Sequence, residues 1–336
     1  MLTNRAGLAS RSPSKERSRC LPAAAETLRR GPPGASSTLT SVPSLLLHLC
    51  AVEELAGVPD LLSAPVAKAL AEDLEYARLG TALPDLPRYE GVRGGLQLLW
   101  PLKATTPFAQ LFHRRAPVTM GLKFAELVAN GALVGREPGL AFACGYFCHL
   151  ALDRVLGPPA SRLAEKHRGP RESLDEARRR VEWTQALFYL EHRHGRPMVG
   201  EPQLRESFRL GKRRLPTAGV GRGLYELIRL GSEEALQASP DKRQVDRWVR
   251  GAFLHGLILS SPLAASSRHL LTKLSRRELF SGEDVDVPVL MAEALASARR
   301  VLERVHAFIS RGLFSRSARE RFLADFPEGE LEPCAA

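Results

Sequence analysis

The chain has 336 residues, enough to bury a large core in one or two domains. Hydrophobic residues make up 44% of it and aromatic residues only 6%, and its abundance of Ala, Leu and Arg favours an all-α protein. The formal net charge is +11, but no basic stripe is interleaved with aromatic residues. We therefore expect no nucleic-acid partner.

Residues 1–41 are rich in Ser, Arg, Pro and Gly and show no hydrophobic period. They predict a disordered basic extension, or a start codon placed too early. The five cysteines are scattered and odd in number, which speaks against a disulfide framework. We find neither a secretory signal nor an apolar run of about 20 residues, so we expect a cytoplasmic protein without a transmembrane segment.

From residue 42 onwards the apolar residues follow a helical period almost throughout. The predicted helices span, in chain order, 43–57, 60–79, 106–114, 118–132, 137–156, 172–193, 219–237, 241–260, 262–275, 287–312 and 315–324. Gly157 and Gly195 are expected to end helices, and residues 81–104 are expected to form an irregular loop.

The same pattern predicts how the chain is organised into domains. A helical domain is expected over 42–195, followed by a basic linker over 196–218. A second helical region over 219–325 is expected to pack on the first or extend it, and 326–336 is expected to be a tail.

The most informative stretch is the apolar run 140–154, which carries His149 and Asp153. Positions i and i+4 lie on the same face of a helix, so these two side chains point the same way. A buried carboxylate must be paired or bound to a cation, and a neutral imidazole is a good metal ligand. Taken alone, the pair is explained either by a hydrogen bond in the core or by a metal site.

Three further residues bear on that choice. His48 and His113 stand on apolar segments, and Asp85 follows a proline where a helix ends. Each of them alone is typical of a core histidine or of a turn. Together with the pair on the apolar run, they supply three imidazoles and two carboxylates, enough for a binuclear zinc-type site.

These residues belong to a series of motifs: Pro-Ser-Leu-Leu-Leu-His ending at His48, Leu-Gly-x-x-x-Pro-Asp-Leu-Pro around Asp85, Phe-His ending at His113, and Gly-Tyr-x-x-His-x-x-x-Asp beginning at Gly145. The series resembles the bacterial zinc-dependent phospholipase C family, whose all-helical fold is shared with the single-strand-specific zinc nucleases. The resemblance covers about residues 42–195, and its last motif is the most specific.

The resemblance implies a multi-helical bundle with two zinc ions. It implies that His113, His149 and Asp153 hold one metal, and that Asp153 bridges to a second metal held with His48 and near Asp85. Asp85 would be the general base or would orient the attacking water. The implied substrate is a phospholipid or another phosphate ester, and peripheral contact with an anionic membrane surface is a further expectation.

Three arginines lie next to these candidate ligands: Arg78, Arg114 and Arg115. A guanidinium group matches the oxygens of a phosphate, so they are candidate phosphate-binding residues. The alternative is that they form a solvated face of the protein.

The chain departs from the family in one important place. The secreted members bind a further metal through His-x-x-x-Glu on a later helix, whereas Arg178 stands here four residues before Glu182. Arginine stays charged and does not ligate zinc. We therefore predict an Arg178–Glu182 ion pair in place of that metal.

Two functions follow from these residues. The first is a metal-dependent hydrolase of phosphate esters, most similar to a phospholipase C phosphodiesterase. The alternative is a noncatalytic helical scaffold or partner-binding protein that retains a structural metal or a His/Asp network. A nuclease, the activity of the fold relatives, would need an aromatic side chain placed to stack a base near the site.

Overall fold

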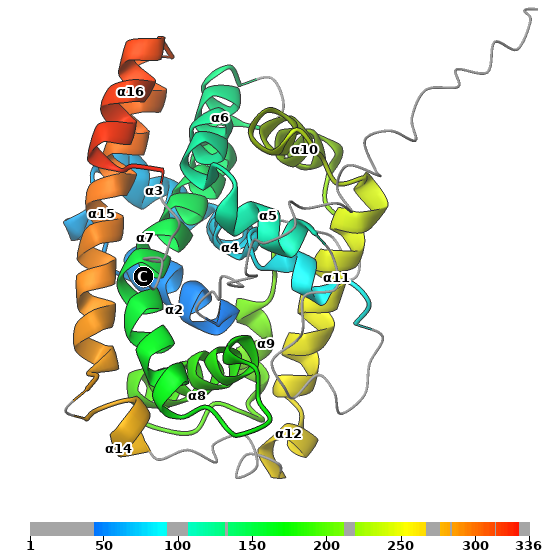
Figure 1. The fold of residues 1–336 in the computed structure, drawn as a ribbon. Helices are drawn as coiled ribbons and strands as arrows, with labels where there is room; N and C mark the ends of the chain where they lie inside the picture. Colours follow the sequence, from blue (N-terminus) through cyan, green and yellow to red (C-terminus); the bar gives the residue numbers. More distant parts are fainter. Residues whose placement is uncertain are drawn as a thin grey trace, which may run out of the picture. The chain divides into compact units, whose positions relative to one another are not determined.

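The computed structural model describes residues 44–92, 107–131, 134–211, 219–266, 276–282, 284–312 and 314–328. Over these ranges the chain forms fourteen α-helices and two short 3₁₀ helices and no β-strand, so the predicted all-α class is confirmed (Figure 1). The chain divides into two compact units, Met1–Thr38 and Leu39–Ala336, and every element below belongs to the second. The predicted extension 1–41 and most of the tail 326–336 lie outside the described residues.

The second unit begins with five short elements: α2 (Leu45–Gly57), η1 (Pro59–Leu61), α3 (Ala64–Glu72), α4 (Leu74–Ala82) and η2 (Leu86–Tyr89). The prediction of one helix over 60–79 is wrong, because the chain restarts twice within that range. Pro65 has no backbone donor and fits best in a first turn, so α3 begins at Ala64. Asp73 then leaves helical geometry, with φ −122° and ψ 36°, before α4 begins.

The central elements are α5 (Phe108–Arg114), α6 (Pro117–Ala129) and α7 (Arg136–Lys166). Gly157 does not end α7 as predicted, because the helix continues through Pro158 and Pro159 for a further turn and more. Prolines inside a helix remove backbone hydrogen bonds. Burial of Leu163 and Ala164 beyond them provides the packing that keeps this segment helical.

The remaining elements are α8 (Leu174–His194), α9 (Pro202–Ser207), α10 (Arg222–Leu236), α11 (Lys242–Leu259), α12 (Pro262–Ser266), α14 (Arg276–Leu279), α15 (Val287–Arg311) and α16 (Arg316–Asp325). Gly195 ends α8 in the left-handed conformation, as predicted, with φ +64°. Residues 196–211 of the predicted linker instead form α9 and bury Leu204 and Phe208 in the core. This part of the segment is therefore packed against the helices around it.

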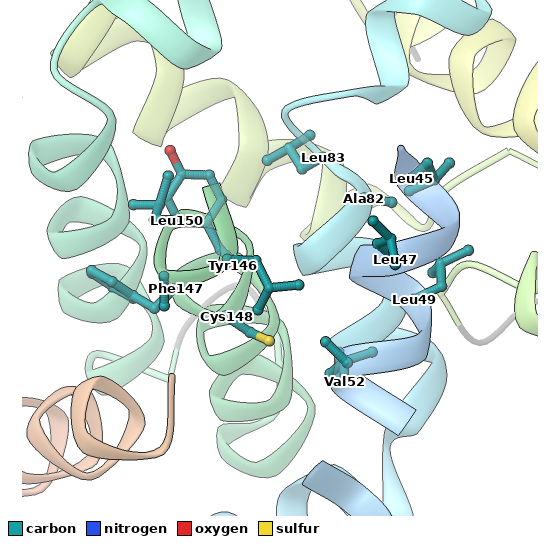
Figure 2. Close-up of a cluster of buried hydrophobic side chains, with 14 of the residues drawn as sticks. Leu45, Leu47, Leu49, Val52, Ala82, Leu83, Tyr146, Phe147, Cys148 and Leu150 are labelled. Carbon is teal, nitrogen blue, oxygen red and sulfur yellow. The ribbon is translucent and has the colours of Figure 1, made fainter. Parts of the chain in front are cut away.

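α7 is the helix around which the core is built. It packs most extensively against α4 and α15, and Figure 1 shows α7 and α15 side by side. Figure 2 shows its apolar side chains together with those of α2 and the end of α4. Among the described residues α7 is the one helix long and apolar enough to cross a membrane, which sequence analysis did not find. However, 89% of its most apolar window is buried inside the protein, as expected of a core helix.

Two glycines allow α4 and α7 to approach unusually closely. A Cβ atom added to Gly80 of α4 would lie well within 3.0 Å of the backbone oxygen of Phe142 on α7. A Cβ added to Gly145 of α7 would clash in the same way with the backbone oxygen of Ala77 on α4. Because backbone atoms meet at both points, no side-chain rotation can relieve either clash. The glycines of the Leu-Gly and Gly-Tyr motifs therefore set the distance between these helices.

We predict that Gly145→Ala lowers the free energy of unfolding by about 2–3 kcal/mol, because the two backbones must move apart. Gly57→Ala is the matched control, since no atom lies within 4 Å of an added Cβ there. The control should be unchanged or more stable by up to about 1 kcal/mol. Urea unfolding followed by circular dichroism measures both, and equal stabilities of the two variants would contradict the close contact.

Candidate metal centre

Five polar residues from three helices and one turn meet in the core of the unit. His48 lies on α2, His113 on α5, and His149 and Asp153 on α7, while Asp85 lies in the turn between α4 and η2. None of them is more than 3% exposed. Their presence needs a physical cause, because burying polar groups without partners costs free energy.

Asp153 lies between two imidazoles. Its Oδ1 is 3.2 Å from Nε2 of His48, and its Oδ2 is 3.1 Å from Nε2 of His149. The two imidazole rings stack, with centroids 3.9 Å apart and planes inclined by 16°. One ligand atom from each of these three residues lies within 4.8 Å of the others, so the group can hold a metal ion.

His113 and Asp85 extend this group. Nε2 of His113 is 3.2 Å from Nε2 of His149 and 3.8 Å from Oδ1 of Asp85. Oδ1 of Asp85 in turn lies 3.2 Å from Nε of Arg88. The structure thus brings all five predicted residues together. The tightest three-ligand group contains His48, however, where the resemblance implies His113.

The contact between His113 and His149 brings two ring nitrogens close together. Nδ1 of His113 lies 3.0 Å from the backbone oxygen of Ala109, and Nδ1 of His149 lies 2.8 Å from that of Thr81. A carbonyl oxygen only accepts, so each Nδ1 carries a proton and donates it. In the neutral rings both Nε2 atoms then present lone pairs to each other across 3.2 Å. A proton or a metal ion between them removes this repulsion.

The atoms around Asp153 favour a metal ion over a proton. Both carboxylate oxygens of Asp153 and both ring nitrogens of His48 are buried and lack a partner in hydrogen-bond geometry. A proton on Nε2 of His149 can be shared with only one neighbour, either Oδ2 of Asp153 at 3.1 Å or Nε2 of His113 at 3.2 Å. A metal ion can instead take lone pairs from imidazole nitrogens and from the carboxylate at the same time. Donation of Nδ1–H to a backbone oxygen, as His113 and His149 do, is also typical of metal-binding histidines.

The pKa shifts of His113, His48 and Asp153 favour the protonation states that bind a cation. Burial holds the pKa of His113 well below its usual value, and burial together with His149 lowers the pKa of His48. Burial alone would raise the pKa of Asp153, but His149 and His48 outweigh it and hold that pKa well below the usual range. Two neutral imidazoles and an ionised carboxylate are therefore available.

His149 and Asp85 shift in the opposite direction. Burial lowers the pKa of His149, but the Asp153 and Asp85 carboxylates outweigh it, so the net pKa is raised. Burial raises the pKa of Asp85 more than Arg88 and the neighbouring histidines lower it. His149 is thus the histidine of the cluster that takes up a proton most readily, and metal binding would displace a proton from its Nε2.

The close contact of α4 and α7 places these ligands. It brings the backbone oxygen of Thr81, in the last turn of α4, to the ring of His149. Carbonyls of a last helical turn have no partner within the helix, so this one is free to orient the imidazole. Tyr146, one turn earlier on α7, donates its hydroxyl to the backbone oxygen of Pro117, 2.9 Å away, and so fastens the segment that follows His113.

The three candidate phosphate-binding arginines lie in different surroundings. Arg78 forms an ion pair with Glu53 at 2.8 Å and also donates to the backbone oxygen of Glu206. Arg115 is exposed and donates to the side chain of Gln237. Arg114 follows His113 directly at the end of α5 and is half-buried. The guanidinium of Arg78 is thus already engaged by Glu53 and Glu206.

Sequence analysis missed Arg88, although it lies three residues after Asp85 and pairs with it. The i, i+3 spacing of the two charges in Asp-Leu-Pro-Arg was a usable signal. The predicted pair of Arg178 and Glu182 is present, with Nε and Oε1 3.1 Å apart and both side chains nearly fully buried. Burial lowers the pKa of Arg178, and the carboxylate of Asp153 partly opposes this shift, so the ion pair lies near the cluster.

The chain matches no known family model, no curated protein and no solved structure. The resemblance to the zinc-dependent phospholipases C therefore rests on the motifs alone and remains a prediction. The geometry of the cluster stands independently of it.

We predict that purified protein binds a divalent transition metal, and that His149→Ala and Asp153→Ala each reduce the bound metal to background, because each removes a ligand of the tightest group. His194→Ala is the matched control, since His194 is exposed at the end of α8. Elemental analysis after dialysis measures the content. Unchanged metal in both ligand variants, or none in the wild type after zinc loading, would contradict the site.

We predict that Arg178→Met lowers the free energy of unfolding by about 3–5 kcal/mol, because it leaves the Glu182 carboxylate buried without its ion pair. The double variant Arg178→Met/Glu182→Leu should lose less than the single one. Arg316→Met is the control, because Arg316 and Glu320 form a pair with the same i, i+4 spacing that is exposed. Chemical denaturation compares the three variants, and a loss no greater than that of the control would contradict a buried pair.

Proposed function

We propose that the protein is a metal-dependent hydrolase of phosphate esters, a phospholipase C-like phosphodiesterase that uses two zinc ions. The observation that carries the proposal is the convergence of three imidazoles and two carboxylates. The Nε2 atoms of His113 and His149 face each other, and each Asp153 oxygen lies beside an imidazole nitrogen. Sites of this donor composition hold zinc and related metals that hydrolyse esters.

The ligands divide between two cations as follows in this proposal. His48, His149 and Asp153 hold one ion, since one ligand atom of each lies within 4.8 Å of the others. His113 and Asp85, next to that group, provide ligands for a second ion. The carboxylate of Asp153 has two oxygens, 3.1–3.2 Å from different imidazoles, and would contribute ligands at the centre of the cluster. Bound cations would polarise a phosphoryl oxygen and make a water more acidic.

The charges around the cluster support an anionic substrate. Asp85 and Asp153 contribute two negative charges, Arg88 contributes one positive charge, and Arg178 is balanced by Glu182. Two divalent cations would leave this region with a net positive charge. A phosphate ester carries the complementary charge, whereas a neutral ester or amide does not.

Asp85 is the residue best placed to move a proton. Its Oδ1 is held by Arg88, while its Oδ2 is buried without a hydrogen-bond partner and can accept a proton from the attacking water. Attack forms a new bond from the water oxygen to phosphorus and breaks the bond from phosphorus to the alcohol oxygen. The alcohol oxygen leaves with the proton that Asp85 took from the water, and Asp85 returns to its carboxylate form. Arg88 opposes the effect of burial on the pKa of Asp85 and orients its carboxylate.

We predict that zinc-loaded protein hydrolyses bis-p-nitrophenyl phosphate and releases the phosphorylated head group from phosphatidylcholine vesicles. Asp85→Asn should lower kcat by about 10²–10³-fold, because the amide cannot take up the proton. Arg316→Gln, an exposed substitution on α16 outside the cluster, is the control and should retain full activity. Product release measured by absorbance and by phosphate analysis checks both.

Two results would contradict the proposal. Protein that holds metal stoichiometrically but hydrolyses neither substrate, and for which Asp85→Asn changes only stability, would be the noncatalytic scaffold with a structural metal. Hydrolysis that persists unchanged in Asp153→Ala would locate the activity elsewhere.

A further inference from the structure

A second feature of the unit is a pocket of about 530 Å³ at the C-terminal end of α2. Its size falls within the range of sites that bind small organic ligands. Its apolar walls come from the end of α2, from the residue that follows it, from η1 and from one face of α15: Leu55, Val58, Leu61, Ala292, Leu295 and Ala296.

The sequence of α15 explains why the pocket is open. Ala292 and Ala296 are one turn apart on the same face, and their small side chains leave the space that larger residues would fill. Leu61 and Val58, on the opposite wall, remain 55% and 42% exposed. They are among the few large apolar side chains that the described residues leave in solvent. An apolar ligand in the pocket would cover both.

The charged residues that line the pocket favour an anionic ligand over a cationic one. Glu53 is neutralised by ion pairs with Arg78 at 2.8 Å and Arg193 at 3.2 Å. Glu54 accepts hydrogen bonds from the hydroxyl of Tyr189 at 2.8 and 3.0 Å and lies 3.5 Å from Arg193. Both acidic residues of the lining are therefore already engaged.

Arg299, one turn beyond Ala296 on the same face of α15, also lines the pocket. It is half-buried, and within the described ranges no carboxylate lies within ion-pair distance of it. Glu303, the acidic residue one turn further along α15, instead accepts a hydrogen bond from the backbone nitrogen of Ser63. The lining thus contains one cationic side chain that a ligand can neutralise.

We propose that this pocket binds an amphiphile with one apolar chain and an anionic head group. The chain lies against the alanine face of α15 and the end of α2, and the head group pairs with Arg299. A guanidinium matches a carboxylate or a phosphate monoester equally well. The site is separate from the metal centre, since His48 precedes Leu55 by two turns of α2, about 10 Å along the helix axis. The inference does not depend on the proposed function.

Fluorescence titration of the full chain with dansyl-labelled undecanoic acid tests the proposal. We expect saturable binding, and we expect both dodecanoate and dodecyl phosphate to compete, which compares the two head groups. Arg299→Gln should raise the Kd of the acid about tenfold, because a charge-assisted hydrogen bond is lost. The same variant should leave the Kd of the uncharged methyl ester unchanged. Arg300→Gln, an exposed neighbour outside the lining, is the matched control and should affect neither probe.

Ala296→Phe fills the pocket and should abolish binding of both the acid and the ester. If Ala296→Phe fails to fold, Arg299→Gln still tests the proposal, because a polar substitution at a half-buried position leaves the core unchanged. The proposal is overturned if no saturable binding occurs, if Arg299→Gln and Arg300→Gln behave alike, or if dodecyltrimethylammonium competes better than dodecanoate. It is also overturned if light scattering finds a dimer that Ala296→Phe converts to a monomer, since the face would then serve as an interface between two copies.

Discussion

The close contact between the backbones of α4 and α7 is the constraint on which the described core depends. Gly80 and Gly145 remove the Cβ atoms that would hold these helices apart. The short distance lets the last turn of α4 offer a backbone oxygen to His149 and places the turn carrying Asp85 beside the same residue. Core packing and ligand placement are therefore two results of one contact, and a change that separates the helices affects both.

The candidate metal centre uses backbone oxygens of helices to orient its histidines. Thr81 contributes a carbonyl oxygen from a last turn, and Ala109 contributes one from the turn before His113. Each fixes the tautomer of one histidine and directs its Nε2 towards the interior. The resulting cluster contains lone pairs that a metal ion could bind. The charges of the adjacent buried pair of Arg178 and Glu182 cancel, so this pair does not change the net charge of the cluster.

α2 connects this centre with the apolar pocket. His48 lies in its first turn, and Leu55 lines the pocket near its other end. The helix is buried along most of its length, and Glu53 and Glu54 near its end are held by ion pairs and by Tyr189. α2 thus carries a residue of the candidate metal centre near one end and a residue of the pocket near the other.

The sequence by itself determined the helical class, most helix positions and the five residues of the cluster. Apolar periodicity and the i, i+4 spacing of His149 and Asp153 are local properties and can be read along the chain. Only the tertiary structure decided which nitrogen atoms face each other, that Arg88 holds Asp85, and that α7 continues past its prolines. These outcomes depend on packing between residues far apart in the chain, which local spacing does not encode.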